Sequence, residues 1–227
     1  MNPFAVLAAA TARELSRLRG CLGGSPIGLV ETGIGGKHLA DRLDEAIDLF
    51  HCDRILLVGI CGGIDPALKT GQNVIPGWVS DPTGDLRISV PWDAWPELAR
   101  LQQDSQDGIG IGGDLASAAR MFSAEEKQRL HALRPGVHAV DLESLAFARF
   151  CQGRGLPWAV LKTIADPMGM ELPIAREMAL LRLPGDLSPE AEVSDRFYPF
   201  QNAVEEAIEN NARAVLSLFG ETRQGNL

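Results

Sequence analysis

Short apolar segments alternate along the chain with longer segments in which apolar residues recur every three or four positions. The short segments have the length of buried strands, and the longer ones have the periodicity of amphipathic helices. Segments of strand type lie at 4–9, 27–31, 54–60, 73–79, 109–111, 137–140 and 156–165. Alternation of this kind is typical of an α/β protein, in which helices pack against a central sheet.

Two of the expected helices begin at a capping box, in which a Ser or Thr and a Glu three residues later satisfy each other's backbone N–H groups. Thr11 with Glu14 marks the first, and Ser123 with Glu126 marks the second. Further helices are expected at 39–50, 95–102, 142–152 and 200–219. The proline-rich segment 167–198 is expected to be a long loop or lid.

Composition and charge exclude several classes of protein. The chain has 227 residues, of which 45% are hydrophobic, and this is too apolar for a disordered protein. It has no apolar stretch of about 18 residues that could span a membrane. The 21 Lys and Arg against 30 Asp and Glu give a net charge of -9, which argues against a nucleic-acid partner. The length favours one domain over residues 1–227.

The cysteines and histidines form no metal or redox motif. Cys21, Cys52, Cys61 and Cys151 lack C-x-x-C spacing, and the chain has no H-E-x-x-H sequence. We therefore expect no metal and no cofactor. Isolated thiols of this kind are typical of a cytoplasmic protein whose cysteines stay reduced.

Three carboxylates follow the ends of expected strands. Glu14 follows the first strand, Glu143 follows the strand that ends at Val140, and Asp166 closes the last strand. Ligands of open α/β sheets bind beyond the carboxyl ends of the strands, so the three can reach one crevice. Each also has a structural explanation, as part of a capping box, in the first turn of a helix, or before a proline in a turn. Their joint occurrence favours a functional site.

Glycine clusters at 33–36 and 59–63 also follow strands. Neither has the spacing of a P-loop or of a dinucleotide-binding loop. Glycine lets a backbone approach a ligand closely, so both clusters are compatible with a ligand held by main-chain amides. A tight turn explains each cluster equally well.

Taken in chain order, these residues resemble the nucleoside phosphorylase and nucleosidase superfamily, and within it the 5'-methylthioadenosine/S-adenosylhomocysteine nucleosidase branch. The resemblance covers most of residues 4–166. It rests on five ordered motifs, VETGIG at 30–35, GICGG at 59–63, GGD at 112–114, AVDLES at 139–144 and LKTIAD at 161–166. The stretch 59–76 also looks like that of the hopanoid-associated phosphorylase-like members. The fold implied is a three-layer αβα arrangement around a mixed, twisted sheet.

The resemblance implies cleavage of the C1'–N9 bond of a purine nucleoside. Asp166 matches the family's general acid for the purine, Glu143 the residue that binds the ribose hydroxyls, and Glu14 the carboxylate that orients or deprotonates the attacking water. Asp166 would need a pKa raised by burial to give a proton near neutrality. The further substrate-binding positions implied are Ile60, Gly62, Leu115, Leu142 and Lys162.

Several residues depart from the family's pattern. Leu142 replaces a methionine, Lys162 replaces an arginine, and Ala165 replaces the serine that precedes the acid, which removes one hydroxyl partner of Asp166. Leu115 and the next residue should face the purine, without the aromatic ring that the nucleosidase branch often stacks there. The loop after Asp166 could cover a bulky or apolar 5' group, so a 5'-modified adenosine is the expected substrate.

The nature of the second substrate is open at this point. Phosphorolytic members carry an arginine before the glycine turn and a Ser or Thr within it, where this chain has Leu57 and Ile60. Water is therefore favoured, although Arg13 and Lys162 could supply positive charge for phosphate. A non-catalytic nucleoside-binding protein is the alternative outside enzymes, supported by Lys162 and Ala165. The resemblance also implies a homo-oligomer, with a dimer favoured.

Overall fold

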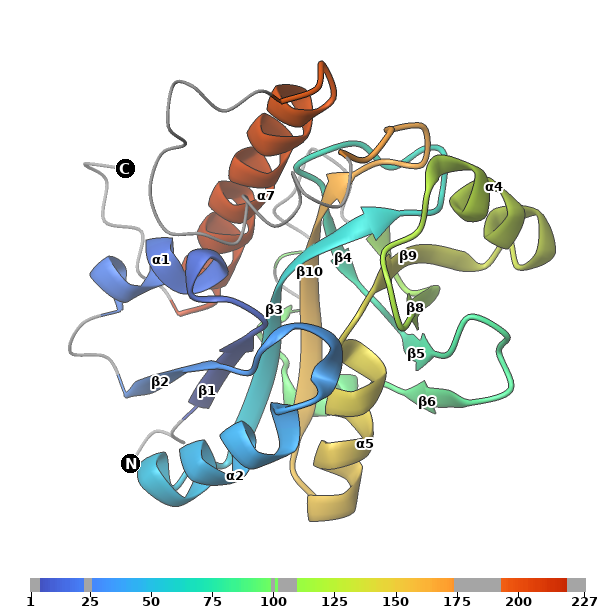
Figure 1. Cartoon of the computed structure of the whole chain (residues 1–227). Helices are drawn as coiled ribbons and strands as arrows, with labels where there is room; N and C mark the ends of the chain where they lie inside the picture. The colour runs from blue at the N-terminus through green and yellow to red at the C-terminus, as the bar shows by residue number, and fades with distance from the viewer. Residues whose placement is uncertain (1–4, 23–25, 99–100, 102–109, 174–192, 220–227) are drawn as a thin grey trace.

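The computed structural model describes residues 5–22, 26–98, 101, 110–173 and 193–219. Their strands are β1 (Ala5–Ala9), β2 (Ile27–Glu31), β3 (Arg54–Gly63), β4 (Asn73–Ile75), β5 (Trp78–Ser80), β6 (Arg87–Ser89), β7 (Gly110–Ile111), β8 (Asp114–Ser117), β9 (Val137–Asp141) and β10 (Trp158–Asp166). They form one sheet in the order β6-β5-β8-β9-β3-β10-β4-β7, with β1 beside β3 and β2 beside β1 (Figure 1). Parallel and antiparallel pairs both occur, so the predicted mixed sheet is confirmed.

Helices cover both faces of this sheet. They are α1 (Ala12–Cys21), α2 (Leu39–Phe50), α4 (Ala124–Leu133), α5 (Ser144–Arg154) and α7 (Phe197–Leu218), with short 3-10 turns η1 (Ile34–Gly36) and η2 (Trp92–Ala94). Helices α1 and α7 pack against each other, and α7 also packs on β10 and β3. Helices α2 and α5 contact each other on the other side of the strands, and α4 lies at the opposite end of the molecule from α1 (Figure 1). The three-layer arrangement is therefore confirmed.

Both predicted capping boxes are formed. Thr11 Oγ1 accepts a hydrogen bond from the Glu14 N–H at 3.3 Å, and Glu14 Oε2 accepts one from the Thr11 N–H at 2.9 Å. Ser123 and Glu126 make the same exchange at the start of α4. The first box holds Glu14 in the first turn of α1, directly beyond the end of β1.

Several element boundaries differ from the prediction, and two of these differences have a local cause. The expected strand 73–79 is divided into β4 and β5 around Pro76, which has no N–H group to donate to a sheet. Helix α5 begins at Ser144, two residues later than expected, because Asp141 still belongs to β9 and its Oδ1 accepts from the Ser144 N–H at 3.2 Å. Glu143 therefore lies at the N-cap position and not within the first turn.

The sequence pattern did not predict the strands β6 and β8. They contain 3 and 4 residues, which is too short for an alternation of apolar and polar residues to stand out. Both lie beside β5 and widen the sheet. The expected strand 109–111 appears as β7, and the final helix begins three residues before its expected start. The predicted loop 167–198 falls largely outside the described residues, as do residues 99, 100 and 102 of the predicted helix 95–102, of which residues 98 and 101 are helical.

Strand β3 has different neighbours along its two halves. Residues 54–57 pair with β1 in parallel, whereas Gly62 and Gly63 pair with β9 in the antiparallel direction. On its other side β3 pairs with β10 from Ile55 to Gly62. Between residues 58 and 61, β1 and β9 diverge, so backbone N–H groups there must find other acceptors. This gap lies just beyond the carboxyl end of β1.

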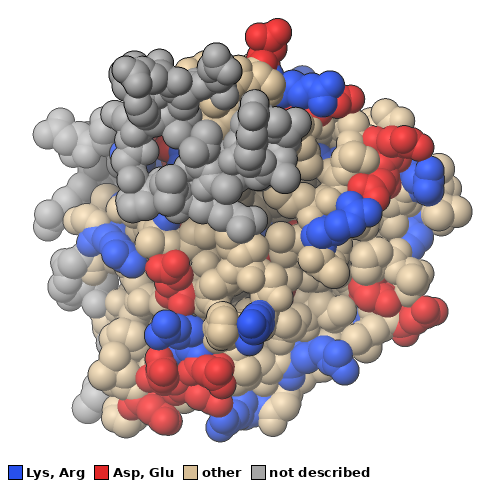
Figure 2. All heavy atoms as spheres, viewed as in Figure 1, with Lys and Arg blue, Asp and Glu red and all other residues tan. Residues whose placement is uncertain are grey.

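Acidic and basic side chains are interspersed on the face of the molecule that Figure 2 shows. Within the ranges that the structure describes, no helix is both long and apolar enough to cross a membrane. The apolar side chains gather in one large cluster around the sheet and in two smaller clusters, one of which includes residues of β8, β9 and α4 and the other residues of β10 and α7. Both smaller clusters adjoin the site described next.

Candidate active site

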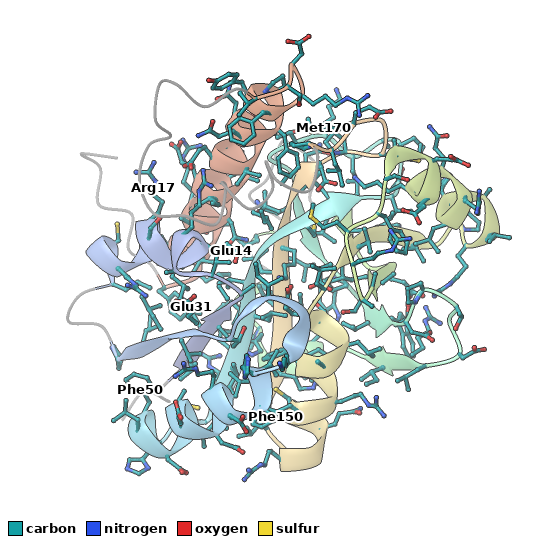
Figure 3. All side chains as sticks on the ribbon, viewed as in Figure 1. Glu14, Arg17, Glu31, Phe50, Phe150 and Met170 are labelled. Carbon is teal, nitrogen blue, oxygen red and sulfur yellow. The ribbon has the colours of Figure 1, made fainter. Side chains whose placement is uncertain are left out.

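Glu14 fills the gap between β1 and β9. Its Oε1 accepts a hydrogen bond from the Ile60 N–H at 3.0 Å, and its Oε2 accepts from Thr11 N and Thr11 Oγ1, each at 2.9 Å. Glu14 is only 7% exposed. Figure 3 shows it beside the strands, while Arg17 on the same helix points outwards. A carboxylate thus takes the place that the carbonyl of a neighbouring strand would have.

Gly59 makes room for this carboxylate. Its φ of 125° lies in a region that favours glycine, and a Cβ atom there would collide with Glu14 Oε1 and lie 3.6 Å from Lys162 Nζ. The Gly59 N–H donates to Asn211 Oδ1 at 3.2 Å. The glycine at the head of the cluster 59–63 is therefore needed because two charged side chains approach the backbone closely.

Lys162 is fully buried on β10 and is surrounded by carboxylates. Its Nζ lies 3.4 Å from Asp141 Oδ2 and 3.7 Å from Glu143 Oε2, but within the described part of the chain it makes no hydrogen bond. Burial alone would lower the pKa of the Lys162 ammonium, whereas Asp141, Glu143 and Glu14 together raise it above its ordinary value. The side chain is therefore a fixed positive charge. We call Glu14, Asp141, Glu143 and Lys162 the Lys162 cluster.

Glu143 has a pKa close to neutrality. Burial raises the pKa of its carboxyl to about 7, and the charges of Asp141 and Glu14 add to the rise, while Lys162 and the Gly35 N–H oppose it. Its Oε1 accepts a hydrogen bond from Gly35 N at 3.0 Å. One amide of the glycine cluster 33–36 is thus used by a side chain of the site itself.

Asp166 is paired with a lysine that the sequence analysis did not select. Lys127 Nζ, from α4, contacts Asp166 Oδ2 and lies 2.7 Å from the Asp166 carbonyl oxygen and 3.4 Å from the Pro167 carbonyl oxygen. Lys127 is 1% exposed and Asp166 is 5% exposed. Burial raises the pKa of the Asp166 carboxyl, and the Lys127 ammonium opposes this rise. We call these two residues the Lys127–Asp166 pair.

Residues of β3 connect the pair with the Lys162 cluster. An irregularity in β10 after Ile164 brings Asp166 opposite Gly62. A Cβ atom on Gly62 would lie 3.1 Å and 3.2 Å from the two carboxylate oxygens of Asp166. The thiol of Cys61 feels the charges of Lys162 and Asp141 as well as those of Asp166 and Lys127, and burial raises its pKa. The Lys127–Asp166 pair and the Lys162 cluster therefore belong to one site.

The remaining predicted positions are apolar and lie around this site in different surroundings. Ile60 packs against the cluster that contains Ala165, and Leu142 packs against the cluster that contains Ala116. Leu115 is fully buried in the main core. Neighbouring strand residues point to opposite faces, so Leu115 and Ala116 do not both face one purine. Of the two, Ala116 is the one that shares a cluster with a predicted site residue.

Lys127 had one signal in the sequence. Positions 127, 130 and 131 fall on one face of α4, and Lys127 and Leu130 are the buried residues of that helix. Lysine is rarely buried unless it is paired, so a lysine on the inward face of a helix indicates a buried acidic partner. The identity of that partner, 39 residues further along the chain, does not follow from the helix itself.

The fold and the site together define an α/β protein with buried carboxylates and two buried lysines at the carboxyl ends of its central strands. The chain belongs to the Phosphorylase superfamily, whose pattern it matches over residues 7–218. It is 24% identical over 226 aligned positions to a 5'-methylthioadenosine/S-adenosylhomocysteine nucleosidase of Colwellia psychrerythraea, with 90% of this chain and 83% of the relative covered.

Solved structures share the fold. The 5'-methylthioadenosine/S-adenosylhomocysteine nucleosidase of Neisseria meningitidis, in complex with methylthio-immucillin-A, matches with a TM-score of 0.74 at 18% identity, covering 95% of this chain and 97% of that one. Futalosine hydrolase of Helicobacter pylori matches with a TM-score of 0.73 at 17% identity, covering 96% and 97%. These likenesses confirm the nucleoside phosphorylase-like fold that the resemblance implied.

Proposed function

We propose that the protein is an N-ribosidase that hydrolyses the C1'–N9 bond of a purine nucleoside, with a 5'-modified adenosine as its substrate. The observation that carries this proposal is the presence of two differently equipped carboxylates, Asp166 and Glu14, in one buried site. One has a pKa raised by burial, as an acid needs, and the other is held by three hydrogen bonds in the gap of the sheet. The names of the relatives, which refer to methylthioadenosine and adenosylhomocysteine, support the choice of substrate.

The reaction needs one proton donor and one proton acceptor. As the C1'–N9 bond breaks, its electron pair stays on the purine, and protonated Asp166 gives its proton to N7. Water forms the new bond to C1' and passes one proton to Glu14. Proton return from Glu14 to Asp166 through solvent restores the enzyme, and the products are the free purine and the ribose with a C1' hydroxyl.

Glu143 is the proposed ribose ligand. In its ionised form it accepts hydrogen bonds from the 2' and 3' hydroxyls, and its Oε1 is already oriented by the Gly35 N–H at 3.0 Å. With a pKa of about 7, it is only about half ionised at neutral pH. Nucleoside affinity should therefore increase as the pH rises through 7.

Charge in the Lys162 cluster supports water over phosphate as the second substrate. Lys162 is accompanied by three carboxylates, so a phosphate dianion beside it would face net negative charge. Arg13, the other cation considered for phosphate, donates from Nε to Glu205 Oε1 at 3.0 Å. Neither cation is therefore equipped to bind an anion strongly.

The test of the proposed function is release of adenine from methylthioadenosine with and without phosphate, followed by chromatography. Adenine release at equal rates under both conditions is expected. Strict dependence on phosphate would replace hydrolysis by phosphorolysis. Adenine binding in a thermal-shift assay, with no base released from a panel of purine nucleosides that includes futalosine, would favour a non-catalytic nucleoside-binding protein.

We further propose that the protein is a cytoplasmic homo-oligomer, with a dimer favoured. Its four cysteines, Cys21, Cys52, Cys61 and Cys151, are free thiols, which suits a reducing compartment. The dimer is the assembly that the family resemblance favours. Light scattering after size-exclusion chromatography measures the mass directly, and a monomeric mass at micromolar concentration would contradict the assembly.

A further inference from the structure

Lys127 is a buried ammonium that the mechanism above leaves without a role. It is one of only two buried lysines in the described part of the chain, and the other, Lys162, stands within the carboxylate cluster. Burying an ion pair requires both charges to be removed from water, so an apolar residue beside Leu130 would fill this face of α4 more simply. The position of Lys127 therefore needs a reason beyond packing.

The acceptors around Lys127 fix the orientation of its side chain. Its Nζ faces three oxygens from two adjacent residues, namely Oδ2 and the carbonyl oxygen of Asp166 and the carbonyl oxygen of Pro167. Carbonyl and carboxylate oxygens accept hydrogen bonds, and the three N–H donors of an ammonium group equal these acceptors in number. Lys127 thus grips the backbone and the side chain of Asp166 together.

The residue before Asp166 makes the hydrogen bond from Lys127 more important. Ala165 occupies the position where the resemblance implies a serine, and it has no hydroxyl to offer the carboxylate. Lys127 supplies the side-chain hydrogen bond to Asp166 that the structure describes. Lys127 donates to Oδ2 of Asp166 and not to Oδ1. A carboxyl group held at one oxygen presents the other in a defined direction.

We propose that Lys127 is a positioning residue for Asp166: it anchors Oδ2, directs Oδ1 towards the purine, and sets the pH at which the acid loses its proton. This inference rests on the proposed function, in which Asp166 gives its proton to the leaving purine. Lys127 acts through Asp166 and does not itself contact the substrate.

Other charged groups near the pair are few and their effects can be separated. Cys61 of β3 interacts with both members of the pair, and its buried thiol stays neutral because its pKa is raised. Lys162 lies four residues before Asp166 on β10, and its ammonium faces Asp141 of β9. Loss of the Lys127 ammonium removes the larger opposition to the effect of burial, so Asp166 should keep its proton to higher pH.

The experiment measures the titration of Asp166 and the pH profile of turnover in the same set of proteins. Aspartate labelled with ¹³C at the carboxyl carbon gives the Asp166 titration by NMR, with Asp166→Asn used to assign its signal. The test variants are Lys127→Met and Lys127→Arg. Lys69→Met is the matched control, because Lys69 is exposed and lies outside the site.

In Lys127→Met the proton affinity of Asp166 should rise at least tenfold, which moves its titration up by one pH unit or more. The alkaline limb of kcat/KM should move in the same direction, and kcat should fall about tenfold because Oδ1 is no longer directed. Lys127→Arg keeps the charge, so its titration should stay within about threefold of the wild-type affinity. In the Asp166→Asn background, Lys127→Met should change kcat less than twofold.

An unchanged Asp166 titration in Lys127→Met overturns the proposal even if turnover falls, because a purely structural lysine would also reduce turnover. If Lys127→Met does not fold, Lys127→Gln replaces it, since its amide can still donate to the two carbonyl oxygens. If the wild-type protein cleaves no nucleoside, the proposed function fails while the NMR titration still decides whether Lys127 sets the protonation of Asp166.

Discussion

The Lys162 cluster and the Lys127–Asp166 pair both bury carboxylates beside a lysine, but their charges balance differently. In the cluster, three carboxylates share one ammonium, and burial with the excess negative charge raises the pKa of Glu143 to about 7. In the pair, one ammonium faces one carboxylate, and burial alone raises the pKa of Asp166 against the lysine. Lysine next to a carboxylate therefore does not define one electrostatic environment.

This difference suits the two ends of a nucleoside. In the proposed reaction, positive charge develops on the ribose ring as the C1'–N9 bond breaks, and a cluster with excess negative charge is suited to stabilise it. The purine gains negative charge, and a protonated acid neutralises it. Substitutions that change the pair and leave the cluster intact, or the reverse, test this comparison.

The largest expected effect is on the pair. Asp166→Asn removes the proton donor but keeps the size of the side chain, so kcat for methylthioadenosine should fall by about 10²- to 10⁴-fold. Methylthioadenosine should still bind, because the Lys162 cluster, which contains the proposed ribose ligand Glu143, is unchanged. Steady-state kinetics and calorimetry measure both quantities, with exposed Asp48→Asn as the matched control. Turnover within a fewfold of the wild type would remove Asp166 from the acid role.

The next change acts on the cluster. Lys162→Met leaves Glu14, Asp141 and Glu143 without their counter-charge, and loss of one partner of a buried ion group costs about 3–5 kcal/mol. Urea unfolding at pH 8 measures this loss of stability. The loss should be smaller at pH 5, where a protonated Glu143 no longer repels the other two carboxylates. Lys127→Met should cost less at pH 8, because its single carboxylate can take up a proton. Equal losses for the two variants would contradict the comparison.

The third prediction concerns the pH dependence of stability. The folded protein holds the Glu143 proton up to a pKa of about 7, against an ordinary value of 4.5, so stability should decrease as the pH rises from 4.5 to 7. The shift corresponds to about 3 kcal/mol. Glu143→Gln should remove this decrease. The free energy of unfolding of the variant minus that of the wild type should therefore be larger at pH 8 than at pH 5. Parallel pH curves for the two proteins would show that Glu143 is not the titrating group.

Local sequence signals predicted the parts of the site that local structure builds. The Thr11–Glu14 capping box and the strand end at Asp166 follow from residues a few positions apart, and both were found. The strand-end argument also selected Glu143, the family resemblance added Lys162 as a site position, and the structure brings both beside Glu14. Their roles in the reaction stay predictions.

The parts that were missed depend on contacts between distant segments. The helix pattern places Lys127 on an inward face, but its partner is fixed only when α4 packs against the end of β10. Gly59 reads as a turn glycine, although its space is taken by the carboxylate of Glu14, 45 positions earlier in the chain. Strands as short as β6 and β8 are stabilised by their neighbours in the sheet and have no periodicity of their own.

The smallest expected effect tests how tightly the pair is packed. A Cβ atom on Gly62 would lie 3.1 Å from Asp166 Oδ2 and 3.2 Å from Lys127 Cε, so these atoms would have to move by a few tenths of an ångström. Gly62→Ala should therefore cost about 1 kcal/mol in unfolding free energy and reduce kcat a fewfold. Gly153→Ala is the matched control, because it lies in α5 with open space around its Cβ position, and it should leave kcat unchanged. An unaltered kcat in Gly62→Ala would mean that the direction of the Asp166 carboxyl tolerates displacement, and the geometry of the pair would then matter less than its charge.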